Sequence, residues 1–379
     1  MYIGLDLGTS GLKGILIDDA QRVLAEATAP LTVARPAPGW SEQAPGDWIL
    51  AVEQVLTALA AHGLDAVRGI GLSGQMHGAT LLDAGDKVLR PCILWNDTRA
   101  HLEAAALDAD PRFRAVTGNI VFPGFTAPKL VWVARHEPEL FARVAKVLLP
   151  KDYLRLWLTG EHVGEMSDAA GTSWLDTGAR GWSADLLEAT GMSLSQMPRL
   201  VEGSEVSGVL RADIAARFGM PAGVIVAGGG GDNAASGIGV GVVKAGQAFV
   251  SHATDQQAAT RAVLEGVTFA IADCRDALAA TGTRIDSLLA VGGGSRSDYW
   301  LAAIATALDT PVSVPVAGDF GGAFGAARLG MMAATGAGAE LATPPEIARV
   351  IEPVTALIPA FAEGHARYRA ARDAIRALV

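Results

Sequence analysis

The chain has 379 residues, half of them apolar, and a formal net charge of −10 at pH 7. This length predicts two domains of ordinary size. The acidic balance argues against nucleic acid as a partner, because nucleic-acid binders carry a basic face. No apolar run is long enough for a membrane helix and no secretory signal is visible, so no membrane contact is expected. The two cysteines are too few for a disulfide framework and are typical of a reducing cytoplasm, where we expect the protein.

The first seventeen residues are predicted to form a β-hairpin. Residues 2–7 alternate apolar with small or polar side chains, and the turn Gly8-Thr9-Ser10-Gly11 leads into a second apolar run over residues 12–17. Such a turn offers backbone N–H groups and hydroxyls to a phosphate. Asp6 beside it is placed to hold Mg²⁺ through water, because hard cations prefer oxygen ligands. An ordinary edge hairpin with a glycine-rich turn is the alternative.

The rest of the chain is predicted to alternate strands and helices, which makes it an α/β protein. The expected strands cover residues 23–33, 67–72, 88–94, 147–149, 224–227 and 287–291. The expected helices cover residues 47–61, 127–136, 138–144, 258–280, 298–308, 321–335 and 360–378. Asp47 is expected to cap the first helix, and residues 95–99 to open another. Residues 160–208 are expected to be loops and short elements, with a domain boundary near residue 221.

One sequence pattern recurs at residues 67–78, 224–233 and 287–300. In each, a strand ends in glycine and a polar residue, and a helix is expected to follow. Ligands gather at the carboxyl ends of strands in open α/β sheets. These three ends and the first hairpin therefore predict one cleft lined by both domains.

Asp232 is the strongest candidate for a catalytic group. It follows Gly228-Gly229-Gly230-Gly231, where four glycines allow a close approach of backbone or ligand. It comes where a strand gives way to a helix, so we interpret it as a base that accepts the proton of a hydroxyl attacking a phosphoryl group. A helix N-cap is the alternative.

Three further segments are candidates for binding. His77, in the loop Gln75-Met76-His77-Gly78, could bond a polyol or be a satisfied buried histidine. Trp95 could wall the carbon face of a sugar or fill the core. The turn Gly292-Gly293-Gly294-Ser295 could admit a nucleotide base or a phosphate, or be a plain tight turn. No HExxH or Cys/His spacing indicates a transition metal.

Together these motifs resemble the FGGY carbohydrate kinases. The resemblance is carried, in family order, by IGLDLGTSGLK, SGQMHG, LWNDTR, GFTAPKLVWV, LLPKDYLRLWLTGE, MSDAAGTSWLD, GGGGDNAA, TRAVLEGV and GGGSRSDYW. It implies an actin-like/ribonuclease-H-like ATPase fold with two domains around a central cleft. Residues 1–221 would hold the sugar site and the first phosphate loop, and residues 222–379 the nucleotide side.

The resemblance also implies an activity, namely phosphorylation of D-xylulose at O5 by ATP with Mg²⁺. It implies that Asp232 is the general base. It places the sugar beside Met76, His77 and Asn233, with Trp95 and Gly124 as walls. It places Asp6 near Mg²⁺, the phosphates at Gly8, Thr9 and Ser10, and the adenosine at Gly293, Gly294 and Asp298. A homodimer is the assembly that such relatives suggest.

The sequence departs from the family pattern after Ser251. The family continues with an LGTSG-type motif that forms a second phosphate hairpin, whereas here His252-Ala253-Thr254-Asp255 follows. The GxFxGL part of the second family signature is also absent, so about a hundred residues are missing judged by family length. With one hairpin of two, the γ-phosphate would be poorly held. Three explanations compete: the sequence as given omits a segment, the segment was removed by engineering, or the natural protein lacks the segment. The flanking motifs are intact, which favours omission or engineering over a natural loss.

Three other functions are weighed against this one. A non-catalytic sugar-binding relative would keep the sugar residues without positioning ATP. A kinase for another ketose or polyol, such as ribulose, would differ only in pocket geometry. An actin-like ATPase of the chaperone or filament type would have no use for a polyol pocket, and the SGQMHG and LWNDTR segments argue against it.

Overall fold

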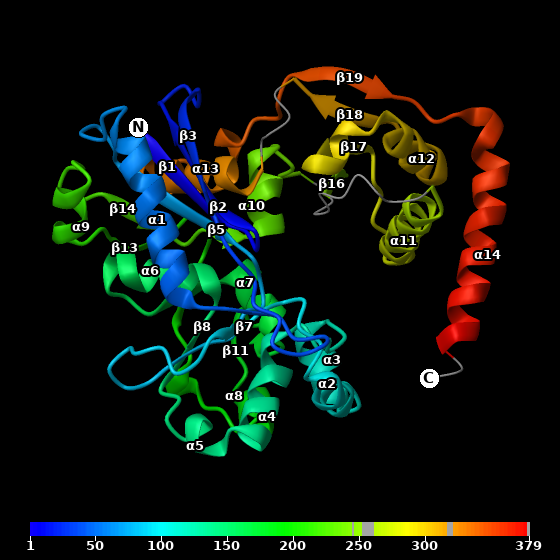
Figure 1. Ribbon diagram of the computed structural model, residues 1–379. Helices are drawn as coiled ribbons and strands as arrows, with labels where there is room; N and C mark the ends of the chain where they lie inside the picture. Colours follow the sequence, from blue (N-terminus) through cyan, green and yellow to red (C-terminus); the bar gives the residue numbers. More distant parts are fainter. Residues whose placement is uncertain (245, 252–260, 317–320, 377–379) are drawn as a thin grey trace. The chain divides into compact units, whose positions relative to one another are not determined.

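The structure is a computed structural model that describes residues 1–244, 246–251, 261–316 and 321–376 (Figure 1). Contacts divide the chain into two compact units. Unit 1 contains Met1–Ser236 and Gly322–Leu341, and unit 2 contains Gly237–Gly321 and Ala342–Val379. Residues 222–236 thus pack with unit 1. The family-domain boundary expected near residue 221 stays a prediction.

Unit 1 is built on one mixed sheet in the order β13-β14-β5-β1-β2-β3. Its strands are β1 (Tyr2–Leu7), β2 (Gly11–Ile17), β3 (Val23–Pro30), β5 (Gly69–Gly74), β13 (Val206–Val209) and β14 (Ile225–Ala227). β1 and β2 form the expected antiparallel hairpin, and β1 runs parallel to β5. A short strand, β15 (Gly230–Gly231), pairs with the end of β5.

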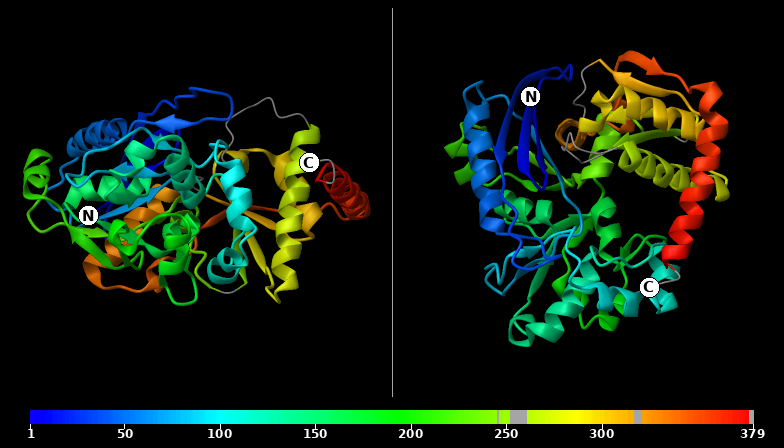
Figure 2. Two further views of the ribbon diagram at one scale, coloured as in Figure 1. Left: turned by 90° about the horizontal axis from the view of Figure 1, so that it is seen from below. Right: turned by 45° about the vertical axis from the view of Figure 1, so that its right-hand side comes forward.

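Helices cover both faces of this sheet (Figure 2). On one face lies α1 (Pro45–Ala60), whose Trp48, Val52 and Leu56 are fully buried in the main core. On the other face lies α13 (Gly322–Thr335), against glycines of β1 and β5. A Cβ built on Gly71 would lie 1.7 Å from the Ala326 carbonyl oxygen, so only glycine permits this approach.

The remaining elements of unit 1 build smaller sheets and helices. The strand pairs are β4 (Glu42–Gln43) with β7 (Cys92–Ile93), β6 (Thr80–Leu82) with β8 (Lys146–Leu148), β9 (Val163–Glu165) with β12 (Arg199–Val201), and β10 (Leu175–Asp176) with β11 (Gly181–Trp182). The helices are α2 (His101–Asp108), α3 (Pro111–Thr117), α4 (Thr126–His136), α5 (Pro138–Phe141), α6 (Pro150–Thr159), α7 (Met166–Ala169), α8 (Ala184–Ala189), α9 (Ala212–Arg217) and α10 (Asp232–Gly239), whose last three residues belong to unit 2. A second core around Phe113, Leu130 and Trp174 holds many of these elements together.

Unit 2 has its own sheet, in the order β16-β17-β18-β19. Its elements are β16 (Gln247–Ser251), α11 (Arg261–Ala280), β17 (Ser287–Val291), α12 (Asp298–Leu308), β18 (Val312–Pro315), β19 (Ile347–Ile351) and α14 (Ile358–Arg376). β16, β17 and β18 are parallel, and Trp300, Leu301 and Ile304 of α12 pack into the core beneath them.

The two sheets differ beside their first strand. In unit 1, β1 lies between β5 and the β2–β3 hairpin. In the described part of unit 2, β16 lies at the edge of the sheet and pairs with β17 alone. The described residues of unit 2 therefore contain no counterpart of the turn between β1 and β2. The segment His252–Asp255, where the sequence departs from the family pattern, lies outside the described residues.

Most expected elements are confirmed, and β17 and α12 match their predicted bounds. Asp47 is not a cap: α1 begins at Pro45 because proline suits the first helical turn, where no partner for its nitrogen is needed. Residues 95–99 do not open a helix, since Asp97 accepts bonds from the Ser41 and Arg99 backbones and holds a turn there. After β5 the chain continues into a loop and β6, and no helix follows.

Other expected bounds shift. Of residues 88–94 only Cys92–Ile93 is a strand. Residues 258–260 and 377–378, at the ends of two expected helices, lie outside the described residues. Within the described ranges no helix is long and apolar enough to cross a membrane.

The contact between α13 and the glycine face of the sheet yields a stability prediction. Gly71→Ala places a methyl group against the backbone of α13, and overpacking of this kind should cost about 3 kcal/mol or more. Gly46→Ala is the matched control, because nothing lies within 4 Å of its Cβ position in α1. Thermal unfolding should show a lower Tm for Gly71→Ala and an unchanged or slightly higher Tm for the control. Equal Tm values for the two variants would contradict the packing.

Candidate active site

Asp232 is brought to the sugar-candidate loop by a short strand pairing. Gly230 and Gly231 of β15 pair with Ser73 and Gly74 at the carboxyl end of β5. α10 begins immediately at Asp232, and the loop that contains Met76 begins immediately after Gly74. A Cβ built on Gly231 would lie 2.9 Å from both Cγ and Sδ of Met76. Two residues expected to share a site are therefore neighbours within unit 1.

The Asp232 carboxylate is partly exposed and has no cationic partner among the described residues. Its Oδ1 accepts a hydrogen bond from the backbone N–H of the next residue, Asn233, at 2.8 Å. A helix N-cap side chain would instead accept from the backbone N–H of the second or third residue after it. Burial raises the pKa of Asp232 above its ordinary value. A more basic carboxylate is a better proton acceptor. Asn233 is exposed beside it.

The glycine run before Asp232 is held at both ends by side chains. A guanidinium N–H of Arg155 donates to the Gly228 carbonyl, and the Ser167 hydroxyl accepts from the Gly231 N–H at 3.1 Å. Gly229 has φ +78° and leaves no room for a side chain, because its Cβ would lie 2.1 Å from the Leu72 carbonyl oxygen. These contacts determine where the run ends and hence where Asp232 stands.

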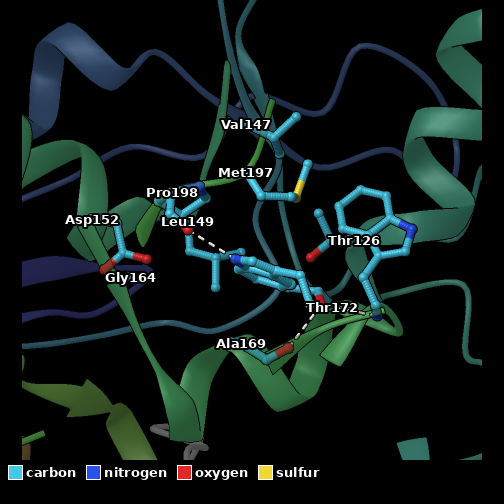
Figure 3. Close-up of a pocket in the computed structure, with 11 residues that line it drawn as sticks. Thr126, Val147, Leu149, Asp152, Gly164, Ala169, Thr172, Met197 and Pro198 are labelled. Carbon is cyan, nitrogen blue, oxygen red and sulfur yellow. Dashed lines mark hydrogen bonds between the residues drawn. The ribbon is translucent and has the colours of Figure 1, made fainter. Parts of the chain in front are cut away.

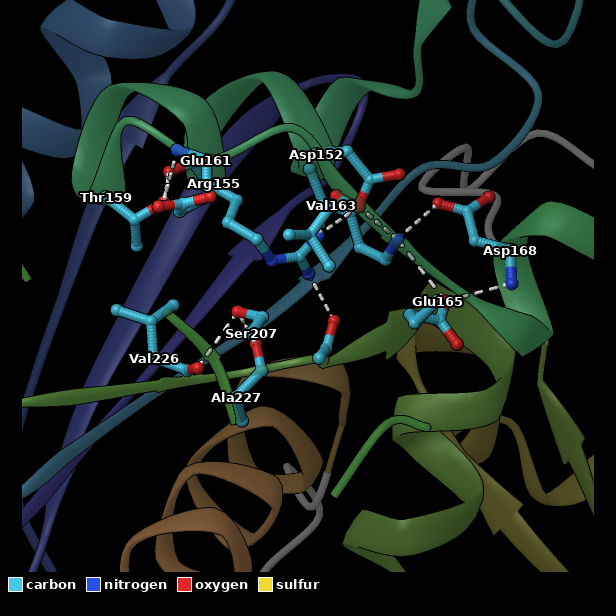
Figure 4. A network of polar contacts seen from close by, with 12 residues as sticks. Asp152, Arg155, Thr159, Glu161, Val163, Glu165, Asp168, Ser207, Val226 and Ala227 are labelled. Carbon is cyan, nitrogen blue, oxygen red and sulfur yellow. Dashed lines mark hydrogen bonds and ion pairs between the residues drawn. The ribbon is translucent and has the colours of Figure 1, made fainter. Parts of the chain in front are cut away.

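A cluster of buried charges supports that anchoring (Figure 4). Lys151 Nζ lies 2.8 Å from Asp152 Oδ1 and 2.9 Å from Asp168 Oδ2, and Arg155 Nη1 lies 2.6 Å from Asp152 Oδ1. Glu165 completes the cluster and accepts the backbone N–H of Ser167. Burial raises the pKa of Asp168 to about 7, against the pull of Lys151. This cluster was not predicted from the sequence, although Lys151, Asp152 and Arg155 stand in the LLPKDYLRLWLTGE segment and Asp168 stands in the MSDAAGTSWLD segment, which Glu165 immediately precedes.

His77 is half-buried, in a conformation that orients its ring. Its φ of +67° is unusual for a side chain other than glycine, and its Nδ1 lies 2.8 Å from the Gly171 carbonyl oxygen. Because a carbonyl only accepts, Nδ1 carries the proton and Nε2 of the neutral ring is an acceptor. Burial, aided by the nearby Lys129 ammonium, lowers the pKa of His77 to about 4. At neutral pH the ring can therefore accept a hydrogen bond from a hydroxyl.

Lys129 of α4 joins two parts of the candidate sugar site. It is fully buried, and its Nζ donates to the carbonyls of His77 at 2.8 Å and Gly124 at 2.7 Å. Burial lowers its pKa to about 7. Sequence analysis did not single out Lys129, although a lysine within the apolar run 127–133 was a visible signal.

Trp95 lies next to Gly124 and reaches the first hairpin. A Cβ on Gly124 would lie 2.2 Å from the Trp95 carbonyl oxygen, so the two backbones touch. The Trp95 indole N–H donates to the Thr9 hydroxyl at 2.9 Å, and the side chain is 44% exposed. Its exposed surface is an apolar wall with its polar end already bonded.

Asp6 lies on the α13 face of β1. Its Oδ1 accepts the Ser73 hydroxyl at 2.7 Å, and a Cβ on Gly322, the first residue of α13, would lie 2.7 Å from the same oxygen. A carboxylate at a helix N-terminus suits a cation–phosphate pair. No group of three or more His, Cys, Asp or Glu residues with metal-site geometry exists among the described residues. The donor set fits Mg²⁺ only if water or phosphate oxygens complete its shell.

The remaining candidates belong to two turns, one in each unit. Gly8 and Ser10 flank Thr9 in the β1–β2 turn of unit 1. Gly293, Gly294 and Asp298 belong to unit 2, at the end of β17 and the start of α12. The Asp298 carboxylate lies 2.6 Å from Arg349 Nη1. The adenosine role of these three residues stays a prediction.

A small cavity elsewhere in unit 1 is not the candidate site (Figure 3). It is lined by Thr126, Leu149, Trp174, Trp182 and Met197 among others, and by none of the candidate residues discussed above. The cavity has room for roughly one water, so it cannot hold a sugar.

The half-buried, neutral His77 yields a prediction about pH. As the pH falls from 6.5 towards about 4, the unfolded chain takes up a proton at residue 77 that the folded chain does not, so acid destabilises the fold. His77→Asn removes this titration, and asparagine tolerates positive φ. Relative to the variant, the wild type should lose up to about 3 kcal/mol of unfolding free energy over this range.

Urea unfolding of both proteins at pH 7 and pH 5 measures the larger part of that difference, about 2 kcal/mol. Because the pKa of Asp168 is raised in the folded protein, its titration makes the fold more stable in acid, which is the opposite effect. Both proteins contain Asp168, so this contribution cancels when their unfolding free energies are subtracted. A difference in unfolding free energy that stays constant between the two pH values would contradict the burial of a neutral ring.

Family models match both parts of the chain. The N-terminal domain of the FGGY family of carbohydrate kinases matches residues 1–239, and the C-terminal domain of the same family matches residues 247–334. These matches cover both sets of candidate residues, those of unit 1 and those of unit 2.

Curated relatives and a solved structure agree with the family models. The xylulose kinase of Escherichia coli (strain K12) is 40% identical over 437 residues, covering 88% of this chain and 90% of that protein. The xylulose kinase of Klebsiella pneumoniae is 52% identical over 275 residues, and the match spans 72% of this chain and about half of that relative, 55%. The crystal structure of "a xyloylose kinase from Brucella ovis" has a TM-score of 0.93 and 51% identity, with 100% of both chains covered.

The length of the first alignment is informative. It exceeds the 379 residues of the whole chain, so the Escherichia coli relative contains segments that have no counterpart here. The family models, the relatives and the fold lead to one conclusion: the chain belongs to the FGGY family of carbohydrate kinases and has their actin-like/ribonuclease-H-like α/β fold.

Proposed function

We propose that the protein transfers the γ-phosphoryl group of ATP to O5 of D-xylulose and forms D-xylulose 5-phosphate. The observation that carries the proposal is the placement of Asp232 beside Met76 in unit 1, with a pKa raised by burial and no cationic partner among the described residues. The names of the similar proteins, xylulose kinases of Escherichia coli and Klebsiella pneumoniae, support the choice of sugar.

In the proposed reaction Asp232 is the general base. Its carboxylate accepts the proton of the sugar 5-hydroxyl while O5 forms a bond to the γ-phosphorus and the bond from that phosphorus to the β-phosphate oxygen breaks. The proton resides on Asp232, and ADP leaves with the bonding electrons. His77 Nε2 accepts a second sugar hydroxyl, Trp95 packs on the sugar carbons, and Asn233 and Met76 complete the contacts.

The phosphate side uses the first hairpin. Backbone N–H groups of the turn around Gly8 and Ser10 would bond phosphate oxygens. Asp6 would hold Mg²⁺ through water, and the ion would neutralise charge on the phosphates. Three further parts of the proposal rest on the family resemblance. These are the adenosine contacts of Gly293, Gly294 and Asp298, the homodimer and the cytoplasmic location.

A second function is favoured by one observation. Among the described residues β16 stands at a sheet edge without the hairpin that β1 has, and the Escherichia coli relative has segments absent here. A chain with one phosphate turn could bind the sugar and transfer phosphate poorly.

Ribulose or another ketose is the alternative substrate, because such sugars differ in the direction of one hydroxyl.

Two measurements separate these functions. An assay of ADP release over a panel of ketoses and polyols should give the highest kcat/KM with D-xylulose. Calorimetry should show binding of D-xylulose and of Mg·ATP. Sugar binding without Mg·ATP binding would identify a sugar-binding relative, and ADP release independent of sugar would contradict both functions.

Asp232→Asn tests the base. The variant should lose about 10²-fold or more in kcat, because the amide cannot take the proton, and its dissociation constant for D-xylulose should change little. Asp213→Asn is the control, since Asp213 is an exposed residue of α9 paired with Arg211. Near-normal turnover of Asp232→Asn would show that another group accepts the proton.

A further inference from the structure

A chain of hydrogen bonds connects the first hairpin to both sides of the candidate sugar site. The Trp48 indole donates to Gln43 Oε1 at 3.1 Å, and Gln75 Nε2 donates to the same oxygen at 3.0 Å. Gln43 Nε2 donates to the Thr9 carbonyl at 2.7 Å. The Thr9 hydroxyl donates to Gln75 Oε1 at 3.0 Å and accepts from the Trp95 indole at 2.9 Å.

The direction of every bond in this chain is determined by its ends. An indole N–H only donates, so the oxygen of Gln43 must face Trp48, and its nitrogen must face the Thr9 carbonyl. Gln75 must then offer its nitrogen to Gln43 and its oxygen to Thr9. The single hydroxyl proton of Thr9 therefore goes to Gln75, and its lone pair takes the N–H of Trp95, which is again an obligate donor.

This assignment conflicts with a phosphate role for the Thr9 side chain. Phosphate oxygens accept hydrogen bonds, and the one proton that Thr9 could donate is already used. Turning the hydroxyl towards a phosphate would leave Gln75 Oε1 without that partner, although Gln75 is only 2% exposed.

The same bonds reach residues of the sugar site on two sides. Gln75 immediately precedes Met76 and His77 in the loop after β5. Trp95 comes from a different loop, after β7, and keeps nearly half of its side chain exposed. An exposed indole whose N–H is fixed has a fixed ring plane, which is what packing against sugar carbons requires.

We propose that Thr9 is a positioning residue of the sugar site: its hydroxyl joins Trp95 to Gln75 and sets the orientation of the indole wall. The phosphate is left to the backbone N–H groups of the turn and to Ser10, whose side chain is exposed. The inference rests on the proposed sugar-kinase function and refines it, because a residue in the phosphate turn controls sugar affinity.

Thr9→Val, Thr9→Ser and Ser10→Ala test the assignment in the full chain. Thr9→Val keeps the shape of the side chain and removes the hydroxyl, so it should raise both KM and the calorimetric dissociation constant for D-xylulose by about tenfold. Its KM for ATP should stay within about twofold of the wild type. Thr9→Ser retains the hydroxyl and should restore sugar affinity. Ser10→Ala should show the reverse pattern, with a raised KM for ATP.

Trp95→Phe provides a second test on the other partner. It removes the indole N–H and retains an aromatic face, so it should weaken sugar binding by a similar factor. Combined with Thr9→Val, it should add little, because both changes remove the same hydrogen bond. This comparison remains informative even where Thr9→Val reduces the yield of folded protein.

Three results would overturn the inference. In the first, Thr9→Val raises KM for ATP and leaves the sugar dissociation constant unchanged, as expected of a phosphate ligand. In the second, the effects of Thr9→Val and Trp95→Phe on sugar binding are additive. In the third, the wild type binds no ketose, which removes the proposed function as well; the first two outcomes leave that function intact.

Discussion

The pairing of Gly230 and Gly231 with the end of β5 is the interaction on which the candidate site depends. It joins two loops that are far apart in the chain by pairing their backbones. Arg155 and Ser167 hold the glycine run from the side, and buried carboxylates orient them. Asp232, the proposed base, is thus placed by packing and charge pairing of residues that are not themselves candidates for contact with the sugar.

The two units contribute unequally to the proposed reaction. The residues proposed to meet the sugar, from His77 and Trp95 to Asp232, lie in unit 1 together with the β1–β2 turn. In unit 2 the described sheet begins at an edge strand, β16, where unit 1 has a hairpin. The proposed recognition of the sugar therefore depends on residues of unit 1. Phosphoryl transfer also needs groups that neutralise charge on ATP, and the described residues of unit 2 contain no hairpin beside β16 that could supply them.

Much of the fold could be predicted from the sequence because its signals are local. Alternation and glycine turns marked the first hairpin, and the strand at residues 287–291 matched its predicted bounds. The prediction that Asp47 caps the first helix was wrong because Pro45 starts the helix earlier. Here two local signals, a capping aspartate and a helix-starting proline, compete for the same helix start. The functions of Lys129 and Lys151 could not be predicted, since each depends on partners brought together only by the folded chain. The same holds for the Thr9 hydroxyl, whose direction follows from two distant tryptophans.

A crystal structure of the chain with bound D-xylulose tests the central claim most directly. The account predicts the terminal hydroxyl of the sugar within hydrogen-bond distance of the Asp232 carboxylate, and another hydroxyl at His77 Nε2. A sugar bound away from the loop at Met76, or an Asp232 side chain bonded to protein while the sugar is present, would contradict it.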